Sequence, residues 1–208
     1  MDPNIELSTK QSPTTPAERA RMKHVPYREA VGSLMHLAVG TRPDIAFAVS
    51  IVAQFGTNPG PIHWETVKRI FHYLAGTKKL ALTYGGGKQG LEGFMDADGA
   101  SQEHHHAISG YAFILDGGAI SWASKKQELV TLSTTEAEYV AATHAAKEAI
   151  WLRHFVQEIF CLLSNPTTLH CDNQSAIALA KDGAFHARTK HNDIRYHFIR
   201  FATDNGSL

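Results

Sequence analysis

Three acidic residues lie where carboxylates from different elements can converge. Asp96 ends an expected strand, Glu138 lies in the first turns of an expected long helix, and Asp172 ends a later strand. Carboxylates that end neighbouring strands can meet at one rim of a sheet, and a helix packed on that sheet can add a third. Because like-charged acids a few ångströms apart resist joint ionisation, such a cluster needs a positive counter-charge.

A divalent metal ion can supply that counter-charge. Mg²⁺ prefers hard oxygen ligands, and two such ions about 3.5–4 Å apart can activate a water molecule and stabilise the leaving oxygen in phosphodiester hydrolysis. Spacing alone does not select these three acids, because a single acid at a strand end is more often a solvated surface residue. Other acids are also available: Asp98, Asp116, Glu136 and Asp204.

The elements that would position the acids follow the glycines at 85–87, the clearest boundary in the chain. Alternating apolar residues and the hairpin signal at 116–118 predict strands, and a long stretch rich in alanine and glutamate predicts a helix. The order βββαβαα predicts an α/β fold. We expect strands at 93–98, 109–115, 119–124 and 167–171, and helices at 134–160, 174–181 and 190–202.

The region before the glycines has a helical pattern. Apolar residues recur at steps of three and four within 27–38, 45–52 and 64–74. Leu80, Leu82 and Tyr84 alternate like a short strand. The first residues have no apolar period. We therefore divide the chain into a flexible arm at 1–25, a helical segment at 26–87 and an α/β domain at 88–208.

Composition excludes several classes of protein. The chain has 208 residues, of which 43% are hydrophobic and 19% charged, so wholesale disorder is not expected. No apolar run approaches the roughly 18 residues that cross a bilayer, and the N-terminus lacks a hydrophobic signal core. The two cysteines fit a reducing compartment. We therefore expect an intracellular protein, cytoplasmic or nuclear, with no membrane contact.

Net charge gives no general attraction to nucleic acid. The chain has 20 basic and 20 acidic residues, so any nucleic-acid binding must come from a local patch. The most basic stretch lies near the C-terminus and is typical either of a phosphate-binding surface, with affinity that falls with salt, or of a solvated helix face. Its candidate phosphate contacts are Arg188, Lys190, His191 and Arg195.

Two amide side chains follow the third acid directly. Asn173 and Gln174 come after Asp172 and can reach sugar hydroxyls or base edges in a minor groove. Asn173 is also well placed to cap the next helix. We expect capping by Asn173 and substrate contact by Gln174.

Other features have structural interpretations. Ser133 to Glu136 matches a capping box at the start of the long helix. Cys171 directly precedes Asp172, so alternation along a strand would point it to the opposite face, into the core. We expect Trp122 and Trp151 to be core or partly buried anchors.

Five long motifs carry a family resemblance. In order and spacing they resemble the C-terminal part of Ty1/copia-type retrotransposon polyproteins, from about Tyr27 onward. The resemblance implies that the upstream helices end a reverse transcriptase and its connection. It also implies a ribonuclease H-like domain, a mixed sheet flanked by helices that cuts the RNA strand of RNA–DNA hybrids. The motifs are YREAVGSLMHLAVGTRPDIAFAVS, HWETVKRIFHYLAGT, GFMDAD, ISGYAFILDGGAISWASKKQELVTLSTTEAEYVAATHAAKEAIWLR and LHCDNQSAIALAKDGAFHARTKHNDIRYHFIR.

The resemblance assigns the catalytic, metal-binding acids residue by residue. They are Asp96 in FMDAD, Glu138 in TEAEY and Asp172 in CDNQ. It implies two Mg²⁺ ions, with Mn²⁺ as a substitute, and a metal-bound water as the nucleophile. The implied partners are an RNA–DNA hybrid and the remainder of a retroelement polyprotein.

Neighbouring acids compete with two of these assignments. We prefer Asp96 to Asp98 because it follows the apolar strand rhythm, two residues after Phe94. We prefer Glu138 to Glu136, which we expect to be solvated, because an apolar stripe brings residue 138 nearer the inward side. That stripe is Val140, Ala141 and Ala145.

The family's last elements have no counterpart here. Its domain continues with a fifth strand and a helix that carries a fourth metal-binding aspartate, whereas this chain stops at Leu208. His191 and Asp193 precede the missing strand and cannot take that role. We expect a truncated domain with a weakened second metal site and an exposed sheet edge. Three hypotheses remain: a two-metal ribonuclease H-like enzyme, a catalytically inactive nucleic-acid-binding remnant, or a pseudogene product that is not stably folded.

Overall fold

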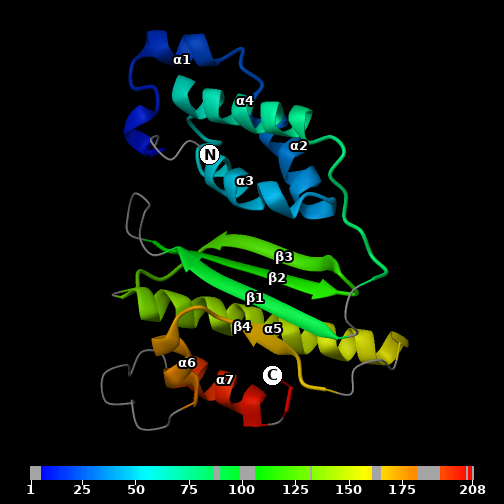
Figure 1. Ribbon diagram of the computed structural model, residues 1–208. Helices are drawn as coiled ribbons and strands as arrows, with labels where there is room; N and C mark the ends of the chain where they lie inside the picture. Colours follow the sequence, from blue (N-terminus) through cyan, green and yellow to red (C-terminus); the bar gives the residue numbers. More distant parts are fainter. Residues whose placement is uncertain are drawn as a thin grey trace. The chain divides into compact units, whose positions relative to one another are not determined.

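The chain forms two units. The computed structural model describes residues 6–86, 90–98, 106–131, 133–160, 165–181, 193–204 and 206–207. A helical unit ends at Leu82, and an α/β unit begins at Thr83. Figure 1 shows the helices of the first unit in blue to turquoise and the strands of the second in green and orange.

Short helices joined by tight turns build the helical unit. The expected apolar period of α2 is confirmed, because Tyr27, Val31, Leu34 and Ala38 are its buried residues. The Tyr27 hydroxyl donates a hydrogen bond of 2.8 Å to the carbonyl of Val52, which fixes α2 against α3. The elements are η1 (Thr9–Gln11), α1 (Pro16–Met22), α2 (Tyr27–Gly40), η2 (Pro43–Ile45), α3 (Ala46–Ala53) and α4 (Pro61–Gly76).

The segment expected as an arm contains η1 and α1 within its described residues. A capping box begins α1: the backbone N–H of Glu18 donates to the Thr15 hydroxyl at 3.3 Å, and the Glu18 carboxylate accepts from the backbone N–H of Thr15 at 3.1 Å. Leu7, which precedes η1, is buried. This segment therefore has local structure that the apolar pattern did not reveal.

A buried histidine joins that segment to α4. His63 is fully buried, and its ring stacks on Phe55 with centroids 4.0 Å apart. Its Nδ1 accepts from the backbone N–H of Gly60 at 2.8 Å, and its Nε2 lies 3.1 Å from the carbonyl oxygen of Ser8. These contacts require a neutral ring with the proton on Nε2, and burial lowers the pKa of His63.

The prediction of a short strand at 80–84 is wrong, because these residues have no strand structure. A strand needs a neighbour that completes its backbone hydrogen bonds, and alternation alone does not provide one. Tyr84 instead places its ring against Gly118, where an added Cβ would overlap that ring. Its hydroxyl donates to the carbonyl of Ala119 at 2.8 Å.

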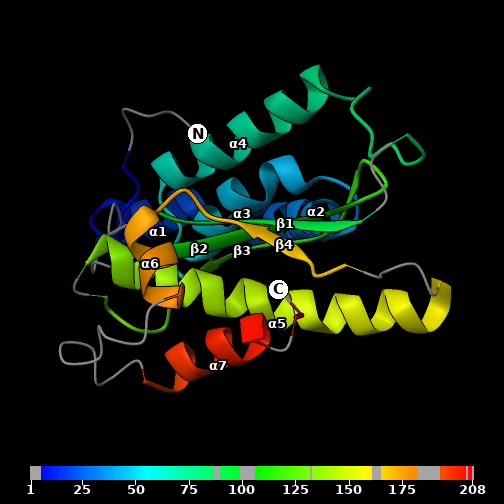
Figure 2. The same cartoon turned by 60° about the horizontal axis from the view of Figure 1, so that its bottom comes forward.

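The α/β unit has the expected element order, βββαβαα, within its described residues. Its sheet has strand order β3-β2-β1-β4, with β1 antiparallel to β2, β2 antiparallel to β3, and β1 parallel to β4. Figures 1 and 2 show α5 along one face of this sheet and α7 packed on α5. The elements are β1 (Leu91–Asp98), β2 (Ile108–Leu115), β3 (Gly118–Lys126), α5 (Thr134–Phe160), β4 (Thr168–His170), α6 (Gln174–Lys181) and α7 (Asp193–Asp204).

The buried face of β1 is the opposite of the one expected. Its odd-numbered residues, including Met95 and Ala97, are buried, whereas Phe94 and Asp96 are exposed. The odd residues pack against a row of buried alanines on α5, so the position of the helix decides which face is covered. Phe94 instead stacks on the neighbouring His170, with ring centroids 4.6 Å apart. The alanines are Ala137, Ala141, Ala145 and Ala149.

The two tryptophans of the α/β unit differ. Trp122 is partly buried in β3, as expected. Trp151 is 57% exposed and stacks on Phe155, so its expected role as a buried anchor is wrong. It lies beside the buried stripe of α5 that contains Leu152 and Val156.

Within the described residues, no helix has both the length and the apolar character that a membrane-spanning segment requires.

Replacing Gly93 by alanine should destabilise the α/β unit. Gly93 pairs with Phe113 and Leu169 on the two neighbouring strands. An added Cβ would overlap the buried Phe113 ring and lie 2.9 Å from Leu169 Cδ1. We expect Gly93→Ala to lower the free energy of unfolding by about 1–3 kcal/mol in urea titrations. The control is Gly110→Ala, since an added Cβ there meets nothing nearer than 3.8 Å. Equal losses in the two variants would contradict the packing described here.

The stability of the helical unit should fall at acid pH. Because burial lowers the pKa of His63 in the folded chain, the unfolded chain takes up a proton first as pH falls. The contribution of His63 is complete above an unfolded pKa of about 6.5 and is lost below it. Urea titrations between about pH 7 and pH 5 should show this loss, and His63→Gln should reduce it. His72→Gln, at an exposed position of α4, should retain it; a loss unchanged in His63→Gln would exclude His63 as its source.

Candidate functional site

Three elements bring the predicted acids to one end of the sheet. The last residue pair between the parallel strands β1 and β4 is Phe94 with His170. Asp96 lies on β1 two residues after Phe94, and Asp172 lies two residues after His170, beyond the end of β4. Glu138 enters from the second turn of α5, which packs on β1.

Glu138 is the buried member of this group. Its residue is 6% exposed, and its Oε2 atom has no hydrogen-bond partner. Burial raises the pKa of Glu138 to about 7, and the charges of Asp96 and Asp172 raise it further, whereas the backbone of Ala97 opposes the shift. Glu138 therefore lies within the electrostatic influence of both other acids.

The geometry suits a cation. Ligand atoms of Glu138, Cys171 and Asp172 all lie within 4.8 Å of one another. Asp96 and Asp172 are exposed, so the site is open to solvent on one side and closed by Glu138 on the other. A buried carboxylate oxygen without a partner, facing further acids, fits a divalent metal ion with oxygen ligands.

The competing acids are placed differently. Glu136 is intermediate in exposure, whereas Glu138 is buried, so Glu138 is the more inward of the two as expected. Its backbone N–H donates to the Ser133 hydroxyl at 3.1 Å, which is one of the two hydrogen bonds of the expected capping box. The acids that raise the pKa of Glu138 are Asp96 and Asp172. Asp98 is exposed at the last position of β1.

Cys171 is the site residue that the sequence did not reveal. Its side chain packs against the core of the α/β unit, as expected, but its Sγ also lies within the 4.8 Å cluster. Burial raises the pKa of this thiol, and the three acids add to the rise. β4 ends at His170, so strand alternation does not extend to Cys171. The feature of the sequence that could have indicated a role for Cys171 in the site is its position immediately before Asp172.

The residues after Asp172 are partly as expected. Asn173 caps α6, because its Oδ1 accepts from the backbone N–H of Ala176 at 3.0 Å. Gln174 is exposed at the first position of α6. Of the predicted phosphate contacts, Arg195 lies on α7. The others, Arg188, Lys190 and His191, lie outside the described residues.

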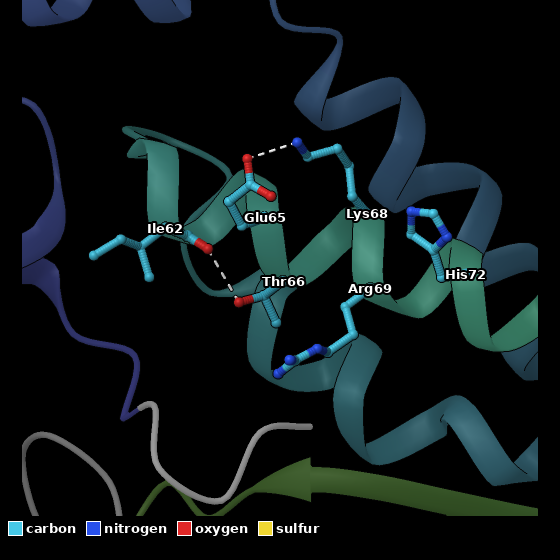
Figure 3. Close-up of a pocket in the computed structure, with 6 residues that line it drawn as sticks. All are labelled: Ile62, Glu65, Thr66, Lys68, Arg69 and His72. Atoms are coloured by element: carbon cyan, nitrogen blue, oxygen red, sulfur yellow. Dashed lines mark hydrogen bonds and ion pairs between the residues drawn. The ribbon is translucent and has the colours of Figure 1, made fainter.

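A hollow of about 480 Å³ lies along α4 of the helical unit, and sequence reasoning did not find it. Its polar groups partly satisfy one another: Lys68 pairs with Glu65 at 2.6 Å, and the Thr66 hydroxyl donates to the carbonyl of Ile62 at 3.0 Å. Figure 3 shows the lining side chains, which all come from α4. This hollow therefore offers mixed charge and no group of converging acids.

Comparison with known proteins identifies the family. The chain is 52% identical over 206 residues to the retrovirus-related Pol polyprotein from transposon TNT 1-94 of Nicotiana tabacum, and 38% identical over 208 residues to the one from transposon RE1 of Arabidopsis thaliana. This chain belongs to the copia-type retrotransposon Pol polyproteins. Each match covers 99% of the chain, which spans 15% and 14% of the lengths of these two Pol polyproteins.

A further relative carries a different name. The secreted RxLR effector protein 161 of Plasmopara viticola is 48% identical over 133 residues, which are 63% of this chain and 94% of that protein. The word "secreted" in that name describes the effector and not this chain. No family model matches this chain.

Removing the charge of Glu138 should stabilise the metal-free Pol segment above neutral pH. A carboxyl whose folded pKa is raised to about 7 contributes stability that is complete below its unfolded pKa and is lost as pH rises through about 7. In chelator, we expect Glu138→Gln to raise the free energy of unfolding at about pH 8 by on the order of 1–3 kcal/mol, with little gain near pH 4. Urea titrations at both pH values test this, with Glu136→Gln as the control. Equal effects of the two variants would exclude a special role for Glu138.

Proposed function

We propose that the α/β unit of this Pol segment is a ribonuclease H-like domain that hydrolyses the RNA strand of RNA–DNA hybrids with magnesium. The observation that carries this proposal is the buried, unpartnered Oε2 of Glu138, in a carboxyl group whose pKa is raised by burial and then by the charges of Asp96 and Asp172. Family membership and the mixed sheet of the α/β unit support it.

The three acids would together bind the metal ions, with one buried and two exposed carboxylates. Asp96, Glu138 and Asp172 would hold two magnesium ions, or Mn²⁺ in their place. When bound, these ions activate a water molecule and stabilise the leaving oxygen of a phosphodiester. Glu138 is fixed by burial, whereas the exposed Asp96 and Asp172 can face the substrate. Asn173, which follows Asp172, caps the helix that begins at Gln174.

Protonation of Glu138 should control metal binding. A carboxylate must be ionised to bind a cation, so binding releases the proton that Glu138 still holds below about pH 7. Glu138, Asp96 and Asp172 would hold the magnesium, whose positive charge would offset the negative charge of the acids. Affinity for magnesium is therefore expected to rise as pH increases through this range.

Substrate binding would use residues next to the acids. Gln174 is exposed at the start of α6 and is proposed to contact sugar hydroxyls of the hybrid, which distinguish RNA from DNA. Arg188, Lys190, His191 and Arg195 are proposed to contact phosphates, so that hybrid affinity falls with salt. The remainder of a Pol polyprotein is the proposed protein partner.

Asp96→Asn should abolish hydrolysis while the chain stays folded. The full chain is incubated with a hybrid whose RNA strand is labelled, with magnesium or with chelator. We expect magnesium-dependent cleavage of the RNA strand, reduced at least about 100-fold in Asp96→Asn, because a metal ligand stabilises the transition state by several kcal/mol. Asp98→Asn, two residues along the same strand, is the matched control and should retain cleavage. Circular dichroism confirms folding.

The same experiment separates the alternative function. A folded chain that binds the hybrid in a salt-dependent manner and never cuts it would be a nucleic-acid-binding remnant. Cleavage that persists in Asp96→Asn, or in chelator, would contradict the three-carboxylate site.

A further inference from the structure

A sulfur atom lies among the oxygen ligands of the carboxylate site. The Sγ of Cys171 and carboxylate oxygens of Glu138 and Asp172 are all within 4.8 Å of one another. Glu138 is only 6% exposed, and its Oε2 has no hydrogen-bond partner, so a buried oxygen of this cluster is left without a ligand or donor. The site therefore contains a soft ligand that magnesium does not use.

Metal chemistry distinguishes this ligand set from that of magnesium. Hard Mg²⁺ takes oxygen ligands, whereas thiolates select softer metals such as zinc. In a tetrahedral zinc site, ligand atoms about 2.0–2.3 Å from the metal stand roughly 3.5 Å apart. Atoms already within 4.8 Å of one another reach that spacing by small side-chain movements.

We propose that Cys171, Glu138 and Asp172 form a binding site for a thiophilic divalent cation of the zinc and cadmium class, with water completing the coordination. On binding, the thiol S–H bond breaks, its proton passes to solvent, and a sulfur–metal bond forms. This inference deepens the proposed function, because Glu138 and Asp172 are shared with the proposed magnesium site. Occupancy by a thiophilic ion therefore excludes magnesium.

The sulfur ligand allows a direct spectroscopic test. Cadmium thiolates have a charge-transfer absorption band in the ultraviolet that oxygen and histidine ligands do not produce. The chain has 13 histidines, including three in succession at 104–106, so zinc affinity alone would not report on this site. Cadmium is therefore added to the folded, reduced full chain, and the band is recorded during the titration.

The chain supplies matched variants. Cys171→Ser should abolish the band, whereas Cys161→Ser, which changes the other cysteine, should retain it. Glu138→Gln and Asp172→Asn should each weaken cadmium binding about tenfold to 100-fold. Circular dichroism confirms that each variant is folded, and the two carboxylate variants test the site even if Cys171→Ser does not fold.

Several results would overturn the inference. They are the absence of a band in the folded wild type, a band that persists in Cys171→Ser, a band lost in Cys161→Ser, and cadmium affinity unchanged by both Glu138→Gln and Asp172→Asn. The last result would identify an isolated thiol rather than a site.

Asp96→Asn separates this inference from the proposed function. Asp96 is outside the 4.8 Å cluster and belongs to the proposed magnesium site. We expect this variant to lose hybrid cleavage and to retain the cadmium band. A wild type that never cuts hybrids but shows a band dependent on Cys171 and Glu138 would refute the nuclease and support the thiophilic site.

Discussion

The close contact between α5 and β1 is the constraint on which the candidate site depends. Alanine side chains on α5, among them Ala137 and Ala141, are buried against the odd-numbered residues of β1. Because alanine is small, the helix backbone can lie close to the strand. Glu138, the neighbour of Ala137, is thereby carried into the interior beside the end of β1. A larger residue in the alanine row would displace the helix and the carboxylate together.

This arrangement is unfavourable for the metal-free protein. A buried carboxylate oxygen without a hydrogen bond forfeits its hydration, and Asp96 and Asp172 add like charge. A bound cation would remove both penalties at once, because it would neutralise the charge and supply the missing partner. As a proposed ligand, the thiol of Cys171 would give the same cluster a second ligand chemistry, and the identity of the metal would decide which side chains hold it.

In the helical unit, by contrast, the buried polar side chains described next have hydrogen-bond partners. His63 is fully buried, yet both of its ring nitrogens have backbone partners. Arg42 makes two hydrogen bonds to Asp44, at 2.9 and 2.7 Å, and the Tyr73 hydroxyl donates to the same carboxylate at 2.9 Å. Satisfied groups of this kind stabilise a fold. The contrast with Glu138 is what makes the carboxylate site a candidate for ligand binding.

Local pattern in the sequence determined the element order of the α/β unit, the bounds of α5 and α6, and the capping by Asn173, because these depend on residues a few positions apart. Local pattern did not select Asp96, Glu138 and Asp172, which the family resemblance assigned, and the apolar rhythm with Phe94 that favoured Asp96 over Asp98 was wrong about the buried face of β1. Only the tertiary structure decided which face of β1 is buried, that Trp151 is exposed, and that Cys171 joins the acids. Those outcomes depend on where α5 packs and where β4 ends, and such long-range contacts leave no period in the sequence.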